Sequence, residues 1–187
     1  VYVAEDGGNW SEGLTAYLAD HLLREREGRG AAYRRDLLQA YADYVQTDRD
    51  FPLEQFRGRH GEVSQAIGYG KAALVFHNLR LQLGDAAFIA GLRRFYAEHR
   101  FRAAGYADLR RAFEAASGRD LTAYFAAWTT RAGAARLALR EVQTEAPPTG
   151  HQVSGLVAQI QDEAPFPLAV PVVVHPVVGL PQQRLVT

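Results

Sequence analysis

The segment that decides how this chain folds is residues 10–27, WSEGLTAYLADHLLRERE. At about 100° per residue, one side of this segment carries Trp10, Leu14, Tyr17 and Leu18. The other side carries Ala16, Ala19 and Leu23. A helix that is apolar on nearly all sides lies in a core, so the segment predicts a buried helix that ends at Gly28.

Other parts of the first two thirds of the chain also show helical spacing of apolar residues. These stretches span residues 31–46, 70–83, 86–99, 107–118 and 121–128. Asp85 and Asp120 stand where N-caps are expected, and Gly118 is expected to end a helix. Residues 47–62 are polar and contain Pro52, so we expect a loop there.

After Gly133 the spacing of apolar residues changes from helical to alternating. The alternation covers residues 135–142, 154–161 and 166–175. Pro171 has no N–H to donate, so its strand is expected at a sheet edge or with a bulge.

These patterns predict an α+β chain with a boundary near residue 133. Residues 1–133 are expected to form a helical domain. Residues 134–187 are expected to form an antiparallel β domain. With 187 residues and 48% hydrophobic content, the chain is long enough to bury a core.

The composition excludes several classes of function. Lys+Arg and Asp+Glu both number 21, so the formal net charge is zero, and nucleic acid is not expected as a partner. The absence of cysteine excludes disulfides, thiolate zinc sites and cysteine catalysis. No apolar run approaches the roughly 18 residues of a membrane helix, so we expect no transmembrane segment in this chain.

Glu12 is the unusual residue of the first helix, because it falls among apolar side chains. Gly13 beside it lets another backbone approach closely. A buried carboxylate needs a cation, either an arginine or a metal ion. The residues alone favour an arginine ion pair, or a first-turn glutamate stabilised by the helix dipole. Arg57 and Arg59 could pair with it or contact a substrate, although a surface loop is the favoured interpretation.

A family resemblance changes that interpretation. Residues 9–17, NWSEGLTAY, resemble a stretch of the aminopeptidase N-like family of zinc peptidases, the gluzincins. The matching residues are Trp10, Glu12, Gly13 and Tyr17. Ser11 stands where the family more often has Asn. In that family a His-Glu-x-x-His helix precedes this glutamate, which is the third zinc ligand, so the resemblance implies that Glu12 is a metal ligand.

Two further stretches agree with the resemblance. Residues 68–80, GYGKAALVFHNLR, resemble the family's Tyr-x-Lys-Gly helix start, with Lys71 in register and Ala72 in place of the usual Gly. The resemblance implies that Tyr69 is the catalytic tyrosine that donates a hydrogen bond to the reacting carbonyl. Without the family, a core aromatic would be the favoured interpretation of Tyr69. Residues 121–133, LTAYFAAWTTRAG, resemble the helix that ends the family's catalytic domain. Residues 159–161 and 165–174 resemble the small β-sandwich that follows it, so the resemblance implies that residues 134–187 are an incomplete β-sandwich-like domain.

The chemistry of such a site needs more than one carboxylate and one phenol. A catalytic zinc takes three protein ligands and keeps a position for water, whose pKa it lowers while it polarises the carbonyl. The Glu within His-Glu-x-x-His acts as general base. A donor placed for the oxyanion contributes about 3 kcal/mol.

This sequence lacks His-Glu-x-x-His. The histidines are His21, His60, His77, His99, His151 and His175, and no two of them are four positions apart. We expect none of them to be a zinc ligand, and we expect His21 and His77 to be packed or surface residues on helices. Zinc is therefore expected in the intact protein and not in these residues alone.

We therefore expect part of a zinc metallopeptidase, cut from the C-terminal side of the catalytic domain and inactive by itself. Its expected partners are a peptide substrate and the missing N-terminal part of the same protein. The resemblance favours a periplasmic or membrane-associated location. The alternatives are a non-catalytic, aminopeptidase-like scaffold for protein interaction and an unrelated helical binding module. The second alternative predicts that Glu12 and Tyr69 lie far apart or on opposite faces.

Overall fold

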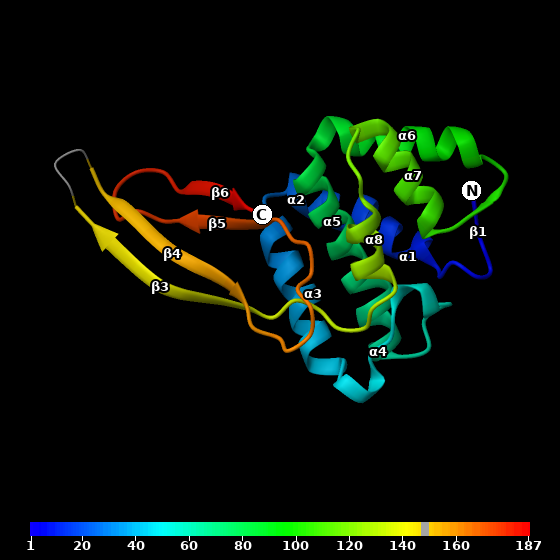
Figure 1. The fold of residues 1–187 in the computed structure, drawn as a ribbon, viewed down its shortest axis with the longest axis horizontal. Helices are drawn as coiled ribbons and strands as arrows, with labels where there is room; N and C mark the ends of the chain where they lie inside the picture. Colours follow the sequence, from blue (N-terminus) through cyan, green and yellow to red (C-terminus); the bar gives the residue numbers. More distant parts are fainter. Residues whose placement is uncertain (147–149) are drawn as a thin grey trace. The chain divides into compact units, whose positions relative to one another are not determined.

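The computed structural model describes residues 1–146 and 150–187 and shows two compact units, residues 1–133 and 134–187. The first unit is helical and the second is built from antiparallel strand pairs (Figure 1). The α+β fold class expected from the sequence is therefore confirmed.

The helical unit contains two long continuous helices, each assembled from three segments, together with several simple ones. The first long helix comprises α1 (Trp10–Thr15), the π-helical segment η1 (Ala16–His21) and α2 (Leu22–Arg26). The second comprises α4 (Glu62–Gln65), the π-helical segment η4 (Ala66–Lys71) and α5 (Ala72–Leu83). The simple helices are α3 (Gly30–Tyr44), α6 (Asp85–His99), α7 (Tyr106–Ser117) and α8 (Thr122–Thr129).

Short elements complete this unit. Single 3₁₀ turns, η2 (Thr47–Arg49) and η3 (Leu53–Gln55), lie in the loop after α3. β1 (Tyr2–Val3) pairs in parallel with β2 (Ala103–Ala104). Helices α6 and α7 lie side by side (Figure 1), and α1 packs against α5.

The helix expected at residues 70–83 begins earlier, at Glu62, so the predicted start is wrong. The Gly61 carbonyl accepts the N–H of Gln65 at 3.0 Å and closes the first turn. That turn is polar and partly exposed, so no apolar spacing marks it in the sequence. Tyr69 consequently lies inside the helix, in η4, and not at its start.

The first long helix is less buried than its apolar character predicts. Trp10 and Tyr17 are buried, but Leu18 is 37% exposed and Leu23 is 54% exposed. A π-helical turn contains more residues than an α-helical one, so η1 shifts the angular positions of the residues that follow it. A uniform projection of 100° per residue therefore misplaces the second half of this helix.

The two expected N-caps are both wrong, because Gly84 is the N-cap of α6 and Leu121 is that of α8. Asp85 is the first residue of α6, and Gly84, with φ of 79°, precedes it. The Asp85 carboxylate forms an ion pair with Arg80 instead, with Nε and Oδ1 2.6 Å apart. The N-cap of α8 is Leu121, so Asp120 lies one residue before it, and its Oδ1 accepts the Thr122 N–H at 2.8 Å.

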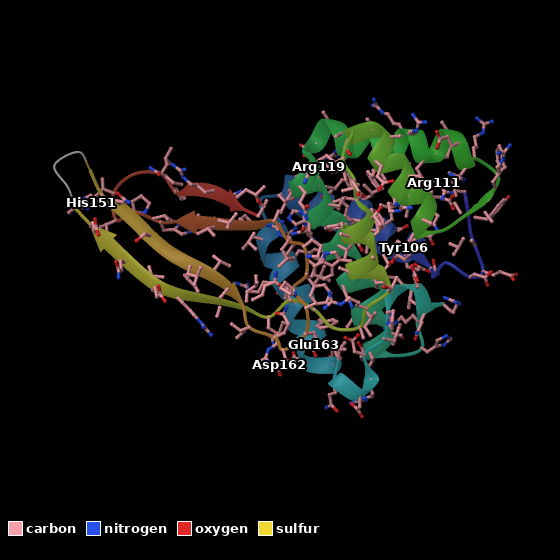
Figure 2. All side chains as sticks on the ribbon, viewed as in Figure 1. Tyr106, Arg111, Arg119, His151, Asp162 and Glu163 are labelled. Atoms are coloured by element: carbon pink, nitrogen blue, oxygen red, sulfur yellow. The ribbon has the colours of Figure 1, made fainter. Side chains whose placement is uncertain are left out.

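Aromatic side chains anchor the core of the helical unit. The Trp10 indole N–H donates to the Ala104 carbonyl at 2.7 Å, and its ring meets Phe95 edge-on with centroids 5.0 Å apart. Tyr106 at the start of α7 is buried, whereas Arg111 on the same helix is exposed (Figure 2). These contacts fix α1 against β2 and α6.

The β unit consists of two antiparallel pairs. β3 (Leu137–Glu145) pairs with β4 (Gln152–Gln159), with an irregularity between Arg140 and Gln143. β5 (Val170–Val174) pairs with β6 (Gln182–Val186). Within the described residues β5 has β6 as its one partner, so Pro171 lies in an edge strand, as its missing N–H predicts.

Within residues 1–146 and 150–187, every helix is too short or too polar to cross a bilayer.

Candidate functional site

Glu12 and Tyr69 meet between the two long helices. The Tyr69 phenol faces the Glu12 carboxylate, and both side chains are half-buried. Burial raises the pKa of Tyr69, hydrogen bonding to Glu12 and the negative charge of Glu12 raise it further, and Arg59 opposes the shift. The phenol is therefore protonated at neutral pH and can serve as a hydrogen-bond donor.

Gly13 makes this meeting possible. A Cβ at Gly13 would lie 2.2 Å from Ala72 Cβ and 3.1 Å from the Gly68 carbonyl oxygen. The backbone of α1 therefore crosses the junction of η4 and α5 at a distance that only glycine permits, as its position next to Glu12 predicts. The close crossing brings residue 12 to residue 69.

Phe56 supports the Tyr69 ring from the loop that precedes α4. The two rings are edge-to-face, with centroids 5.9 Å apart. A Cβ at Gly68 would lie 2.2 Å from the Phe56 ring, so the ring covers this glycine closely. Phe56 is 2% exposed, which fixes its position and limits where the Tyr69 ring can lie.

The start of α1 holds the same loop. The Asn9 N–H donates to the Phe56 carbonyl at 2.7 Å, and Asn9 Nδ2 donates to the Arg57 carbonyl at 3.3 Å. The Arg57 guanidinium donates to the Glu54 carbonyl, and Arg59 lies 3.9 Å from Glu62. These partners place both arginines in the surface loop, which is the interpretation favoured from the sequence.

Both helices of the site contain a π-helical segment, and the two segments lie beside the Glu12–Tyr69 pair. Glu12 precedes η1 by one turn, and Tyr69 lies within η4. π-helical turns are rare in proteins overall, but those that occur are frequently found at functional sites. A cavity of about 170 Å³ adjoins Tyr69 and is lined by both helices and α3.

The residues near Glu12 do not form a complete zinc site. Over the described residues, the one group of three potential ligands that lie close together is His21, Glu25 and His77, and Glu12 is not in it. A zinc ion of the expected kind needs three protein ligands. Among the described residues, Glu12 thus belongs to no set of three potential ligands that lie close together.

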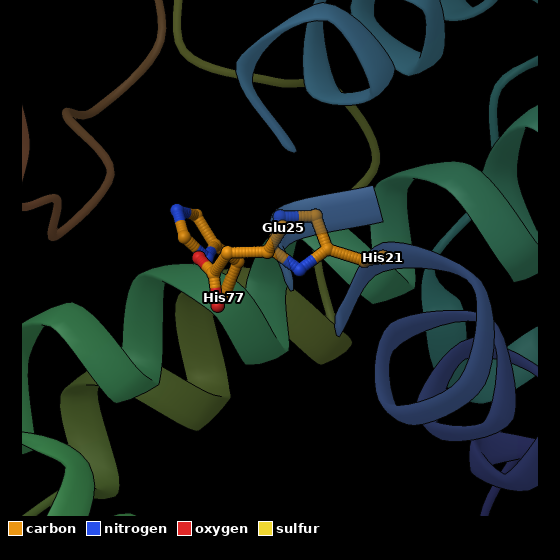
Figure 3. Close-up of side chains that lie close together, drawn as sticks. All are labelled: His21, Glu25 and His77. Atoms are coloured by element: carbon orange, nitrogen blue, oxygen red, sulfur yellow. The ribbon is translucent and has the colours of Figure 1, made fainter. Parts of the chain in front are cut away.

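The structure brings together a cluster that sequence reasoning missed. His21 and Glu25 come from the first long helix and His77 comes from α5, and their potential ligand atoms all lie within 4.8 Å of one another (Figure 3). His21 and His77 are buried residues on helices, at 1% and 9% exposure. The spacing of four between His21 and Glu25 was the available signal. No spacing pattern links either residue to His77.

Two arginines and Tyr17 surround this cluster. Arg34 Nη1 donates to His21 Nε2 at 2.8 Å. Arg80 Nη1 lies 2.8 Å from Glu25 and donates to the Tyr17 hydroxyl at 3.2 Å. Burial lowers the pKa of His21 and lowers that of His77 to about 3, so both imidazoles are neutral at pH 7.

Lys71, the only lysine of the chain, has a packing role. It is 3% exposed, its Nζ donates to the Arg131 carbonyl at 3.5 Å, and it lies over the ring of Tyr41. Burial lowers the pKa of Lys71, and the nearby Asp50 carboxylate opposes that shift. Lys71 thus joins α3 to the end of the helical unit.

The sequence matches a known family over this same region. Residues 9–128 match the peptidase family M1 domain, a span that begins just before Glu12 and ends at Trp128 in α8. The match therefore covers both residues of the Glu12–Tyr69 pair and most of the helical unit.

Curated proteins similar to the chain are aminopeptidases. The chain is 35% identical to aminopeptidase N of Lactococcus lactis over 68 residues, which cover 36% of the chain and 8% of that protein. It is 32% identical to aminopeptidase N of Streptomyces lividans over 117 residues, covering 62% of the chain and 13% of that protein. It is 26% identical to the alanine/arginine aminopeptidase of Saccharomyces cerevisiae over 141 residues, which cover 73% of the chain and 16% of that protein. The chain thus spans less than a fifth of the length of each.

Proposed function

The chain belongs to the peptidase family M1, and from this premise we propose that it is part of a zinc-dependent, aminopeptidase-like metallopeptidase. In this proposal residues 1–133 are part of the catalytic domain, and residues 134–187 belong to the β domain that follows it. Glu12 supplies the third zinc ligand and Tyr69 the oxyanion donor. The two histidine ligands come from a His-Glu-x-x-His segment outside these 187 residues, and these residues alone do not cleave peptides.

The observation that carries the proposal is the contact between Tyr69 and Glu12. Two residues 57 positions apart in the sequence face each other from two helices that a glycine holds in close contact. An unrelated helical module has no reason to bring together the two residues that the family resemblance selects. The opposite arrangement, with the side chains on separate faces, would have excluded the site.

The chemistry follows from the states of the two groups. When bound, zinc would supply an activated water, and one carboxylate ligand in this chain is Glu12. Hydrolysis of a peptide bond places negative charge on the former carbonyl oxygen. The Tyr69 phenol keeps its proton, because burial and Glu12 raise its pKa, and it can donate a hydrogen bond to that oxygen. Phe56 and the close helix crossing hold the phenol in place before the reaction.

The test is an aminopeptidase assay on the gene product that contains these residues, with aminoacyl-4-nitroanilide substrates. Tyr69→Phe is expected to lower kcat by about 100- to 1,000-fold with little change in KM, since one oxyanion donor is removed. Glu12→Gln is expected to lower both zinc content and activity. Tyr96→Phe, which changes an exposed phenol on α6, is the matched control and should leave activity unchanged.

The outcome distinguishes the proposal from the non-catalytic scaffold. A gene product that folds but is inactive, and whose zinc content does not fall in Glu12→Gln, would support the scaffold. If Tyr69→Phe retains the full kcat, the assignment of the oxyanion donor fails even though the family membership stands.

A further inference from the structure

The buried cluster of His21, Glu25 and His77 shares no residue with the Glu12–Tyr69 pair. Its two imidazoles come from separate helices, with ring centroids 4.8 Å apart (Figure 3). Glu25 completes the cluster and keeps 37% of its side chain exposed, so ions from solvent can reach it. Two imidazoles and a carboxylate are ligands that zinc and related divalent metals prefer.

His21 carries an unsatisfied atom in this cluster. Its Nδ1 is buried and has no hydrogen-bond partner among the described residues, whereas its Nε2 accepts a hydrogen bond from Arg34. An arginine can only donate, so with this partner at Nε2 the His21 proton is on Nδ1. A buried polar atom without a partner is costly, and a bound ion is one of the arrangements that satisfies such an atom in native proteins.

In His77, unlike His21, the Nδ1 atom has a polar neighbour. Its Nδ1 lies 3.5 Å from the Tyr17 hydroxyl, and the Tyr17 ring stacks on His21 with centroids 5.0 Å apart. A Tyr17 hydroxyl that accepts from Nδ1–H leaves the Nε2 lone pair of His77 free to bind a metal. Such an outer partner is the usual way in which a ligating histidine is oriented.

We propose that His21, Glu25 and His77 form a second metal site, which binds one divalent transition metal ion of the zinc type and joins η1 and α2 to α5. Tetrahedral zinc with bonds of about 2.0–2.1 Å holds its ligands about 3.3 Å apart. Because the ligand atoms lie within 4.8 Å of one another, closure requires movements of about 1.5 Å or less. This site does not depend on the proposed peptidase function.

Arg34 and Arg80 each occupy a ligand atom of this site. Arg80 pairs with Glu25 and also with Asp85, so it can release Glu25 and keep an ion pair. On metal binding the His21 proton moves from Nδ1 to Nε2, and Arg34, which is half-exposed, turns away from it. The metal thus competes with Arg80 for Glu25, and it needs the His21 tautomer with the proton on Nε2, whereas Arg34 favours the tautomer with the proton on Nδ1.

The experiment is a Zn²⁺ titration of the 187-residue chain in competition with a chromophoric chelator, with Co²⁺ absorption as a second readout of the ligand geometry. The expected result is one equivalent of zinc. Glu25→Gln preserves side-chain shape, His77→Gln replaces the imidazole with a neutral polar side chain, and each is expected to weaken binding by roughly 100-fold or more. Arg80→Gln frees Glu25 from its competitor and is expected to tighten binding about tenfold.

Matched variants test whether zinc binds at a different histidine of the chain. His60→Gln and His151→Gln change exposed histidines, the latter next to β4 (Figure 2), and should leave zinc affinity unchanged. Far-UV circular dichroism of each variant verifies that the fold is retained. The proposal is overturned if the chain binds no zinc, or if Glu25→Gln and His77→Gln bind it as tightly as the parent. Loss of zinc in Glu12→Gln alone would overturn it too, since the ion would then lie at the Glu12–Tyr69 pair.

Discussion

Replacing Gly13 with alanine tests whether the helix crossing at this residue is as close as the structure shows. The new methyl group would lie 2.2 Å from Ala72 Cβ, 3.1 Å from the Gly68 carbonyl oxygen and 3.2 Å from the Ala72 carbonyl carbon. Two of these atoms are backbone and the third is attached directly to it. None can move without displacing a helix.

The expected cost follows from two opposing effects. Forcing a methyl group into a packed contact costs about 1–3 kcal/mol, and the rigid neighbours place Gly13→Ala at the upper end of that range. Alanine in a helix is favoured over glycine by about 1 kcal/mol, which offsets part of the cost. The free energy of unfolding should therefore fall by about 2 kcal/mol.

Urea denaturation followed by circular dichroism measures this change as a shift of the midpoint at constant m-value. Gly70→Ala is the matched control, because its methyl group would meet nothing closer than 3.8 Å. That variant should be stabilised by up to about 1 kcal/mol, so the two substitutions are expected to have opposite signs.

A second substitution tests the contact between the methyl group introduced at residue 13 and Ala72 Cβ. Ala72→Gly removes the atom that the new methyl group meets first, so the double variant Gly13→Ala/Ala72→Gly should be more stable than the sum of the two single changes predicts. The coupling energy should be about 1–3 kcal/mol. If Gly13→Ala unfolds at the parent's urea midpoint or above it, the close crossing and the positioning of Glu12 derived from it are refuted.

Two further predictions concern ionisable groups. Glu12→Gln should lower the pKa of Tyr69 while the contribution of burial remains, which NMR titration of the tyrosine ring carbons measures; an unchanged pKa would show that the two groups do not interact. Burial lowers the Lys71 pKa below 10.5, so the folded state binds fewer protons than the unfolded state between the folded pKa and 10.5. The free energy of unfolding therefore rises as the pH increases through this range. Lys71→Met lacks this dependence and should be at least as stable as the parent at pH 7, with an advantage that shrinks by pH 10; a constant difference across that range contradicts the lowered pKa.

The sequence was sufficient where the signal is local. Periodicity identified the helices at residues 31–46 and 107–118 and the change to strands after Gly133, because side-chain spacing along one element reflects the face it buries. It failed at the start of α4, where the first turn is polar. It also failed beyond Ala16 in the first helix, where a π-helical turn changes the period itself.

The sequence by itself determined which residues were candidates for the functional site. It singled out Glu12 by its apolar neighbours, Gly13 by the space it leaves, and Tyr69 through a family motif. Only the tertiary structure decided which of these groups meet. Glu12 reaches Tyr69, and His77 reaches His21, because two helices cross closely, and such a crossing depends on packing between residues more than fifty positions apart. The spacing of residues along one helix says nothing about the distance between side chains on two different helices. The fold alone therefore decided which side chains lie close together across helices.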